Sequence, residues 1–142
     1  MKLFLILLAL TLSLAACVTN EHISPSAAVL SAAASAPNSV HGIFEVTVKG
    51  TGTQDGIVYL NSEEDYRDQR NLTVAINSEA YKQLAMQLGA DPQVALKGKR
   101  LLVNGNARRV TVNFMLEGKP SGKYYFQTHV NVTNSSQIQV VK

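Results

Sequence analysis

Hydrophobic and polar residues alternate along most of the chain beyond residue 41, in short segments separated by turn residues. A period of two is typical of strands that bury one face. Strands are predicted at 43–49, 57–60, 72–76, 100–103, 110–116, 123–132 and 137–141. A hairpin loop is predicted at 118–122, because it holds Gly118, Pro120 and Gly122, which favour turns.

One segment follows the period of a helix instead. Its apolar positions share one helical face: Ala80, Tyr81, Leu84, Ala85 and Leu88. Asn77 or Ser78 can cap its start and Gly89 can end it. We therefore expect an amphipathic helix that packs on a sheet. Asp91 and Pro92 open a further short helical turn.

Three strands, one helix and two or three further strands follow one another in the order of an oligonucleotide/oligosaccharide-binding (OB) fold. Four stretches add to this: Val58 to Asp68 (with LNSEEDYRD), Asn71 to Ile76, Leu96 to Arg100, and Ser136 to Val140. They resemble bacterial OB-fold domains found alone or beside micrococcal-nuclease-like domains. The resemblance covers roughly 42–141.

This resemblance implies a mainly β fold: a five- to six-stranded OB-like barrel with one amphipathic helix between strands 3 and 4. It implies little about chemistry, because the domain is not the nuclease part and one fold hosts many functions.

The N-terminus has the pattern of a secretory signal. Met1 and Lys2 precede an apolar run over 3–14, which is shorter than the ~20 residues of a membrane-spanning helix. The run ends in Leu14-Ala15-Ala16-Cys17, which resembles the lipobox of bacterial lipoproteins. That resemblance implies removal of 1–16 and attachment of lipid to Cys17. The alternative is an ordinary signal peptide that leaves Cys17 as an unpaired thiol.

The lipobox implies a location and a first partner. Several acyl chains on one residue anchor a protein stably, so the expected partner is the lipid bilayer. Val18, rather than Asp, follows the acylated Cys17 and by resemblance favours the outer membrane of the cell envelope. We expect residues 17–40 to be the acylated Cys and a flexible Ser/Ala/Pro linker, although 27–36 could form a short helix. The folded domain is expected at 41–142.

Composition argues against several kinds of site. The 142 residues suit a single domain, and a single Cys excludes an internal disulfide and Cys-rich metal sites. His22, His41 and His129 are dispersed and form no catalytic motif. We therefore expect no enzyme activity, no cofactor and no metal, with His129 solvated or hydrogen-bonded.

An acidic segment at 63–68 offers oxygen ligands of the kind that calcium prefers, but its spacing is not that of an EF-hand. The favoured interpretation is a structural corner. In it Asp65 or Asp68 would cap backbone amides, and Arg67 or Arg70 would pair with a carboxylate.

Basic residues cluster between Lys97 and Lys123, near several aromatic residues. Candidate ligand-binding residues are Tyr59, Arg100, Arg108, Arg109, Lys119, Lys123 and Tyr125. Single-strand binders combine such charges with stacking rings; alternatively, the rings fill the core and the lysines keep an exposed hairpin edge from pairing. Removal of 1–16 would take away Lys2 and lower the net charge from +3 to +2, which gives little long-range attraction.

The leading hypothesis is a non-catalytic binding or interaction module for an envelope protein or glycan. The alternative is single-stranded nucleic-acid binding in DNA uptake or scavenging.

Overall fold

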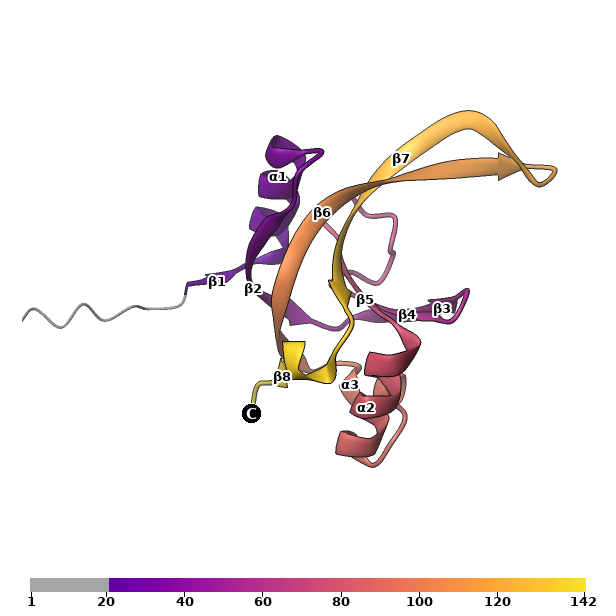
Figure 1. The fold of residues 1–142 in the computed structure, drawn as a ribbon. Helices are drawn as coiled ribbons and strands as arrows, with labels where there is room; N and C mark the ends of the chain where they lie inside the picture. The colour runs from indigo at the N-terminus through magenta and orange to yellow at the C-terminus, as the bar shows by residue number, and fades with distance from the viewer. Residues whose placement is uncertain (1–20) are drawn as a thin grey trace, which may run out of the picture.

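The structure is a computed structural model that describes residues 21–142, and its fold is mainly β (Figure 1). The strands are β1 (His22–Ile23), β2 (Val40–Thr47), β3 (Gly50–Gln54), β4 (Ile57–Asn61), β5 (Leu72–Ile76), β6 (Arg100–Leu116), β7 (Lys119–Val132) and β8 (Ile138–Val140). The helices are α1 (Pro25–Ser35), α2 (Ser78–Leu88) and α3 (Pro92–Leu96), with a 3-10 turn at Ser135–Gln137. Within the described residues, no helix is both long and apolar enough to cross a membrane.

The eight strands form one mixed sheet rather than the predicted closed barrel. Its order is β1-β2-β6-β7-β5-β4-β3, with β8 beside β6. The strands β1 and β2 are parallel, as are β5 and β7, and the other pairs are antiparallel. The strands β2 and β3 are successive parts of one chain segment, but they have different neighbours at the two ends of this order. Between them Val48 N donates to Lys99 O, and Lys49 N donates to Asn61 O, so the segment passes from β6 to β4.

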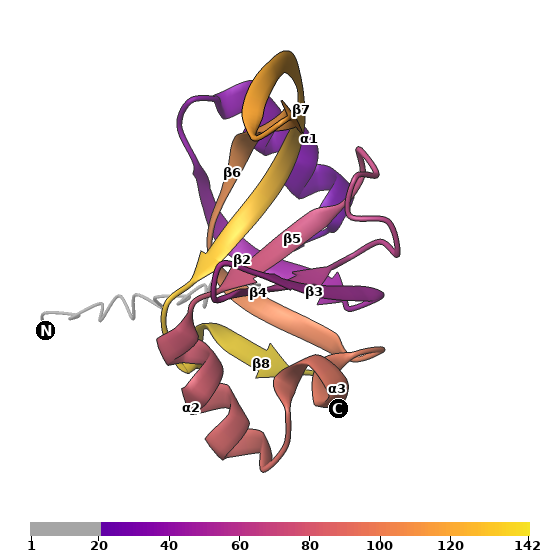
Figure 2. The same ribbon diagram turned by 90° about the vertical axis from the view of Figure 1, so that its right-hand side faces the viewer.

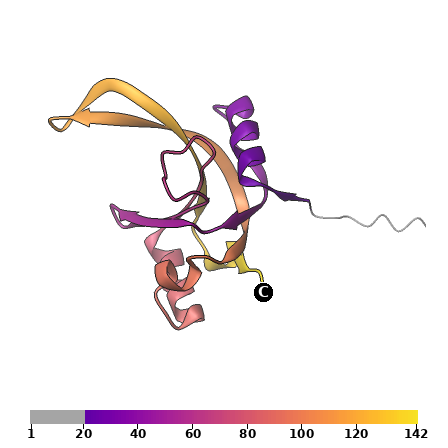
Figure 3. The same ribbon diagram turned by 180° about the vertical axis from the view of Figure 1, so that it is seen from behind.

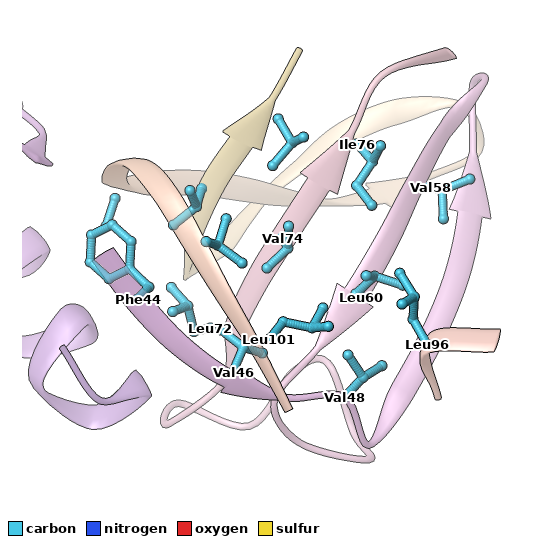
Figure 4. Close-up of a cluster of buried hydrophobic side chains, with 14 of the residues drawn as sticks. Phe44, Val46, Val48, Val58, Leu60, Leu72, Val74, Ile76, Leu96 and Leu101 are labelled. Atoms are coloured by element: carbon cyan, nitrogen blue, oxygen red, sulfur yellow. The ribbon is translucent and has the colours of Figure 1, made fainter. Parts of the chain in front are cut away.

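The inward faces of the strands build one hydrophobic core, in which Phe44, Leu60, Leu72 and Leu101 are among the largest fully buried side chains (Figure 4). Alternation along each strand places the intervening polar side chains outward.

The predicted limits of the helix α2 are confirmed. The Asn77 side chain accepts a hydrogen bond from Ala80 N (2.8 Å), and Gly89 ends the helix in the left-handed conformation. Its residues Ala80 and Leu84 are buried in the core, whereas Leu88, at the last turn, is partly exposed.

The segment expected to be a flexible linker is folded from His22 onward. The strand β1 pairs with β2 (Figure 1), and α1 packs against β2 and β6 (Figure 2). The helix starts at Pro25 after the cap Ser24, and Ala28 and Ala32, one turn apart, are fully buried. Their small side chains let the helix approach the sheet closely. The fold therefore begins about twenty residues before the predicted boundary. Besides α2, it contains α3 where the further helical turn was predicted, and α1 in the segment that was expected to be a linker.

The β6–β7 hairpin also differs from expectation. The strand β6 is continuous from 100 to 116, and the predicted loop at 118–122 is replaced by a two-residue turn. Glu117 (φ 50°) and Gly118 (φ 75°) form this turn, and both have the positive φ of a type I′ hairpin. The strand β2 pairs with β6 only as far as residue 107, and β5 pairs with β7 only from residue 128. Residues 108–127 therefore form a two-stranded ribbon, here called the arm, that projects from the body (Figures 1 and 3).

Candidate functional site

The outward face of β3, β4, β5 and β7 carries a pocket of about 410 Å³. Four rings line it, those of Tyr59, Tyr66, Tyr125 and His129. Between the rings lie uncharged polar side chains: Thr51, Thr53, Gln54, Asn61, Thr73 and Gln127. Among the described residues that line this aromatic pocket, none is Lys, Arg, Asp or Glu. The pocket therefore offers ring faces, hydroxyls and amides to a ligand.

One wall of the pocket is a hydrogen-bonded row on β7. Tyr125, Gln127 and His129 occupy successive outward positions of the strand. His129 Nε2 lies 2.7 Å from Gln127 Oε1, and Gln127 Nε2 donates to the Tyr125 hydroxyl at 2.8 Å. The Tyr59 ring lies 6.0 Å from the His129 ring across the strands. These contacts fix the orientation of the side chains before any ligand arrives.

The electrostatic state of His129 follows from its surroundings. Burial lowers the pKa of the ring below its ordinary value of 6.5, and the nearby Arg108 guanidinium lowers this pKa further. The imidazole is therefore neutral at pH 7, and its Nε2 hydrogen is donated to Gln127 Oε1. The wall of the pocket carries no charge at neutral pH.

The opposite side of the pocket is held by a buried polar network centred on Asn71. Asn71 Nδ2 donates to Asn61 Oδ1 (3.1 Å), to Thr73 Oγ1 (2.9 Å) and to the Tyr66 carbonyl (3.3 Å), while Asn71 Oδ1 accepts from Glu63 N (3.1 Å). Buried amides that meet all these partners fix a loop firmly. The network thus places Tyr66 beside the pocket. Sequence reasoning found the stretches that hold these residues but attached no role to them.

The acidic segment at 63–68 confirms the structural interpretation. Asp65 Oδ1 accepts from Arg67 N (2.9 Å) and Nε (3.1 Å). Asp68 Oδ1 accepts from Arg70 N (2.9 Å), and Asp68 Oδ2 accepts from Arg70 Nη2 (2.7 Å). The Arg70 hydrogen bonds lower the pKa of Asp68 to about 2, and those of Arg67 lower the pKa of Asp65. Among residues 21–142, no group of three or more His, Cys, Asp or Glu side chains is arranged to hold a metal ion.

Of the predicted ligand-binding residues, Tyr59 and Tyr125 line the pocket. Arg108 lies opposite His129 in the antiparallel register of β6 and β7, so both side chains project from the same face. The signal that could have found His129 is its shared face with Gln127. No local sequence pattern shows that Tyr59 on β4 and His129 on β7 lie near each other, because the two strands are neighbours of β5 and not of each other.

The other predicted cations on β6 do not join the pocket. Arg100 Nη1 bonds to Glu45 Oε1 at 3.1 Å. Arg109 projects from the opposite face to Arg108, and its guanidinium lies over the Phe126 ring, 4.2 Å from the centroid. Neither side chain lines the aromatic pocket.

The remaining predicted residues lie elsewhere. Lys119 and Lys123 belong to the arm, and Cys17 lies outside the described residues. The cations therefore do not merge with the aromatic rings into one basic groove. Comparison with protein-family models, curated proteins and solved structures found no match.

Proposed function

We propose that the chain is an envelope lipoprotein, anchored in the outer membrane through acylated Cys17, whose OB-like domain binds a neutral glycan in the aromatic pocket. The domain has a binding role and no catalytic one.

The OB-like assignment is supported by the strand connections. The segment 40–54 pairs with β6 over its first half and with β4 over its second half, and β5 runs parallel to β7. These connections, with β4–β5 and β6–β7 antiparallel, are those of a five-stranded OB core in which segment 40–54 serves as the first strand.

The uncharged, ring-lined pocket is the observation that carries the proposal. The apolar faces of sugar rings pack on aromatic side chains, and sugar hydroxyls pair with the amides and hydroxyls that lie between the rings. A charged polymer would leave its charges uncompensated here, because none of the lining residues within the described part of the chain is a cation.

Gly52 supplies the test. It lies opposite Tyr59 in the register, and a Cβ built on Gly52 would meet no atom within 4 Å, so a longer side chain would extend into the pocket without strain. We expect wild type to bind short oligomers of N-acetylglucosamine by titration calorimetry. Gly52→Leu should weaken this binding at least tenfold, and Gly52→Ala is the matched control with binding close to wild type. Absence of binding by wild type, or equal binding by Gly52→Leu, would refute the glycan assignment.

Nucleic acid is a second candidate, because Arg108 lies opposite His129 and so places a cation at the pocket margin. Titration with a short single-stranded oligonucleotide tests it, using wild type and a variant with Arg108→Ala, Arg109→Ala and Lys123→Ala. We expect no appreciable binding of either at about 0.15 M salt, because backbone binding needs several phosphate contacts. Tight binding by wild type that falls steeply with salt, and is lost in the variant, would put nucleic acid first.

A further inference from the structure

The tip of the arm exposes three consecutive apolar side chains. Phe114 is 47% exposed, Met115 60% and Leu116 67%. Phe114 touches the Tyr125 ring at a centroid distance of 5.3 Å, but Met115 and Leu116 are not part of the core cluster. Such a contiguous apolar patch at the end of a projecting ribbon is typical of an interaction site.

The apolar side chains lie on both faces of the ribbon. Met115 pairs with Pro120 and Leu116 pairs with Lys119, and successive strand residues project to opposite sides. The flat surface of a protein would cover only one of these faces. A medium that surrounds the tip covers both.

The edge of the ribbon is not suited to strand addition. Pro120 has no N–H to donate, and Gly122 takes a positive φ of 85° that interrupts a regular strand. Recognition by the tip therefore rests on its side chains and not on its backbone.

The arm is also strongly basic. Over 108–127 it carries four cations, Arg108, Arg109, Lys119 and Lys123, against one carboxylate, Glu117, which gives a net charge of +3. Among the residues that the structure describes, none of these four cations forms an ion pair. Their charge is available to an anionic partner.

We propose that the tip of the arm inserts into the interface of an anionic lipid bilayer. Phe114, Met115 and Leu116 enter the boundary between headgroups and acyl chains, while Lys119 and Lys123 meet the phosphates. The arm and β1 lie at opposite ends of the fold (Figures 1 and 3). If the chain is also anchored before β1, the domain would lie with its long dimension along the bilayer surface. The proposal requires neither the glycan site nor acylation of Cys17.

The absence of Trp from the chain allows a direct measurement. Phe114→Trp creates a single fluorescent reporter at the tip of the arm. The full chain carrying this substitution is reconstituted into vesicles of phosphatidylglycerol and phosphatidylcholine, with or without bromine on the acyl chains. We expect the emission to shift to shorter wavelength and to be quenched at least twofold by the brominated lipid.

Met86→Trp is the matched control, because Met86 is exposed (84%) on α2, a helix that lies away from the arm (Figures 1 and 3). Its emission should stay unquenched, and thermal melts should show that both reporters leave the fold intact. Adding Lys119→Glu and Lys123→Glu to the Phe114→Trp chain should at least halve the quenching, as should vesicles of phosphatidylcholine alone. Equal quenching at 114 and 86 would overturn insertion of the tip, and quenching indifferent to both charge changes would overturn the role of the lysines.

Discussion

Two leucines on α2 offer a quantitative test of how this helix packs, because Leu84 is 3% exposed and Leu88 is 36% exposed. Replacing Leu84 with Ala removes three buried carbon groups, or about 2.4 kcal/mol at roughly 0.8 kcal/mol each. A residual cavity on the order of 40 Å³ adds about 1 kcal/mol. We therefore expect Leu84→Ala to lower the free energy of unfolding by about 3 kcal/mol, a large share of a typical ~5–15 kcal/mol.

Leu88→Ala is the matched control. It removes the same groups from a site that is about one-third exposed and open to solvent, so the expected cost is at most about 1.5 kcal/mol. Urea unfolding of the fragment that begins at Glu21 and contains the whole core measures both. With a slope of about 1–3 kcal/mol per molar, Leu84→Ala should lower the midpoint by at least about 1 M. Equal costs for the two variants, or a cost below about 1 kcal/mol for Leu84→Ala, would show that α2 does not pack as described.

Three further results are expected. Ala32→Asp should destabilise the fold by several kcal/mol, because it buries a charge in the core, and the exposed Ala33→Asp should not; equal urea midpoints would mean that α1 is not packed. The pKa of His129 in an NMR titration should lie below 6.5, and Arg108→Ala should raise it. Because the pKa of His129 is lower in the folded chain, the unfolded chain binds more protons as the pH falls below 6.5. The contribution of neutral His129 to the free energy of unfolding is therefore complete above pH 6.5 and is lost as the pH drops below it; a native pKa at or above 6.5 would contradict this. Cys17→Ser should leave an unprocessed precursor and abolish labelling by a fatty-acid probe; unchanged labelling would rule out the lipid anchor.

Elements with strong local signals could be predicted from sequence. The helix α2 has its cap at Asn77, its stop at Gly89 and an apolar stripe between them, and β5 coincides with the predicted strand 72–76. In each, the local pattern and the tertiary environment favour the same conformation.

Elements with weak or misleading local signals could not be predicted from sequence. The helix α1 is built of Ala and Ser with no distinct apolar stripe, and a short Ala-rich segment is marginal without packing. Its stability comes from the surface that β2 and β6 offer, which no local pattern describes. Within β6, Asn104 and Gly105 resemble a turn. Both residues instead lie inside the strand. Gly105 leaves room for Val130, because a Cβ at position 105 would lie only 2.8 Å from Val130 Cγ1.

The candidate site also has one part that the sequence predicts, the direction of its side chains, and one that it does not, the pairing of its strands. Alternation predicts that Tyr59 and His129 face away from the core, because each lies between buried neighbours. Their meeting depends on β5 pairing with β4 on one side and, in parallel, with β7 on the other. That parallel pair joins residues more than fifty positions apart, which makes it invisible to a pattern read along the chain.

The stretch from Val58 to Ile76, which carries most of the OB-fold resemblance, contains a buried polar network that positions one side of this pocket. Asn61 and Thr73 face each other across β4 and β5, and both bind Asn71, whose amide also holds the carbonyl of Tyr66. An aliphatic residue at 71 would leave the buried Asn61 and Thr73 groups with fewer partners and would release the loop that carries Tyr66. The carboxylates that would suggest a catalytic or metal-binding loop have a separate structural role, because Asp65 binds Arg67 and Asp68 binds Arg70. The loop is thus held at both levels, by these acidic side chains at its surface and by Asn71 beneath it, and Tyr66 lies beside a pocket whose other rings come from distant strands.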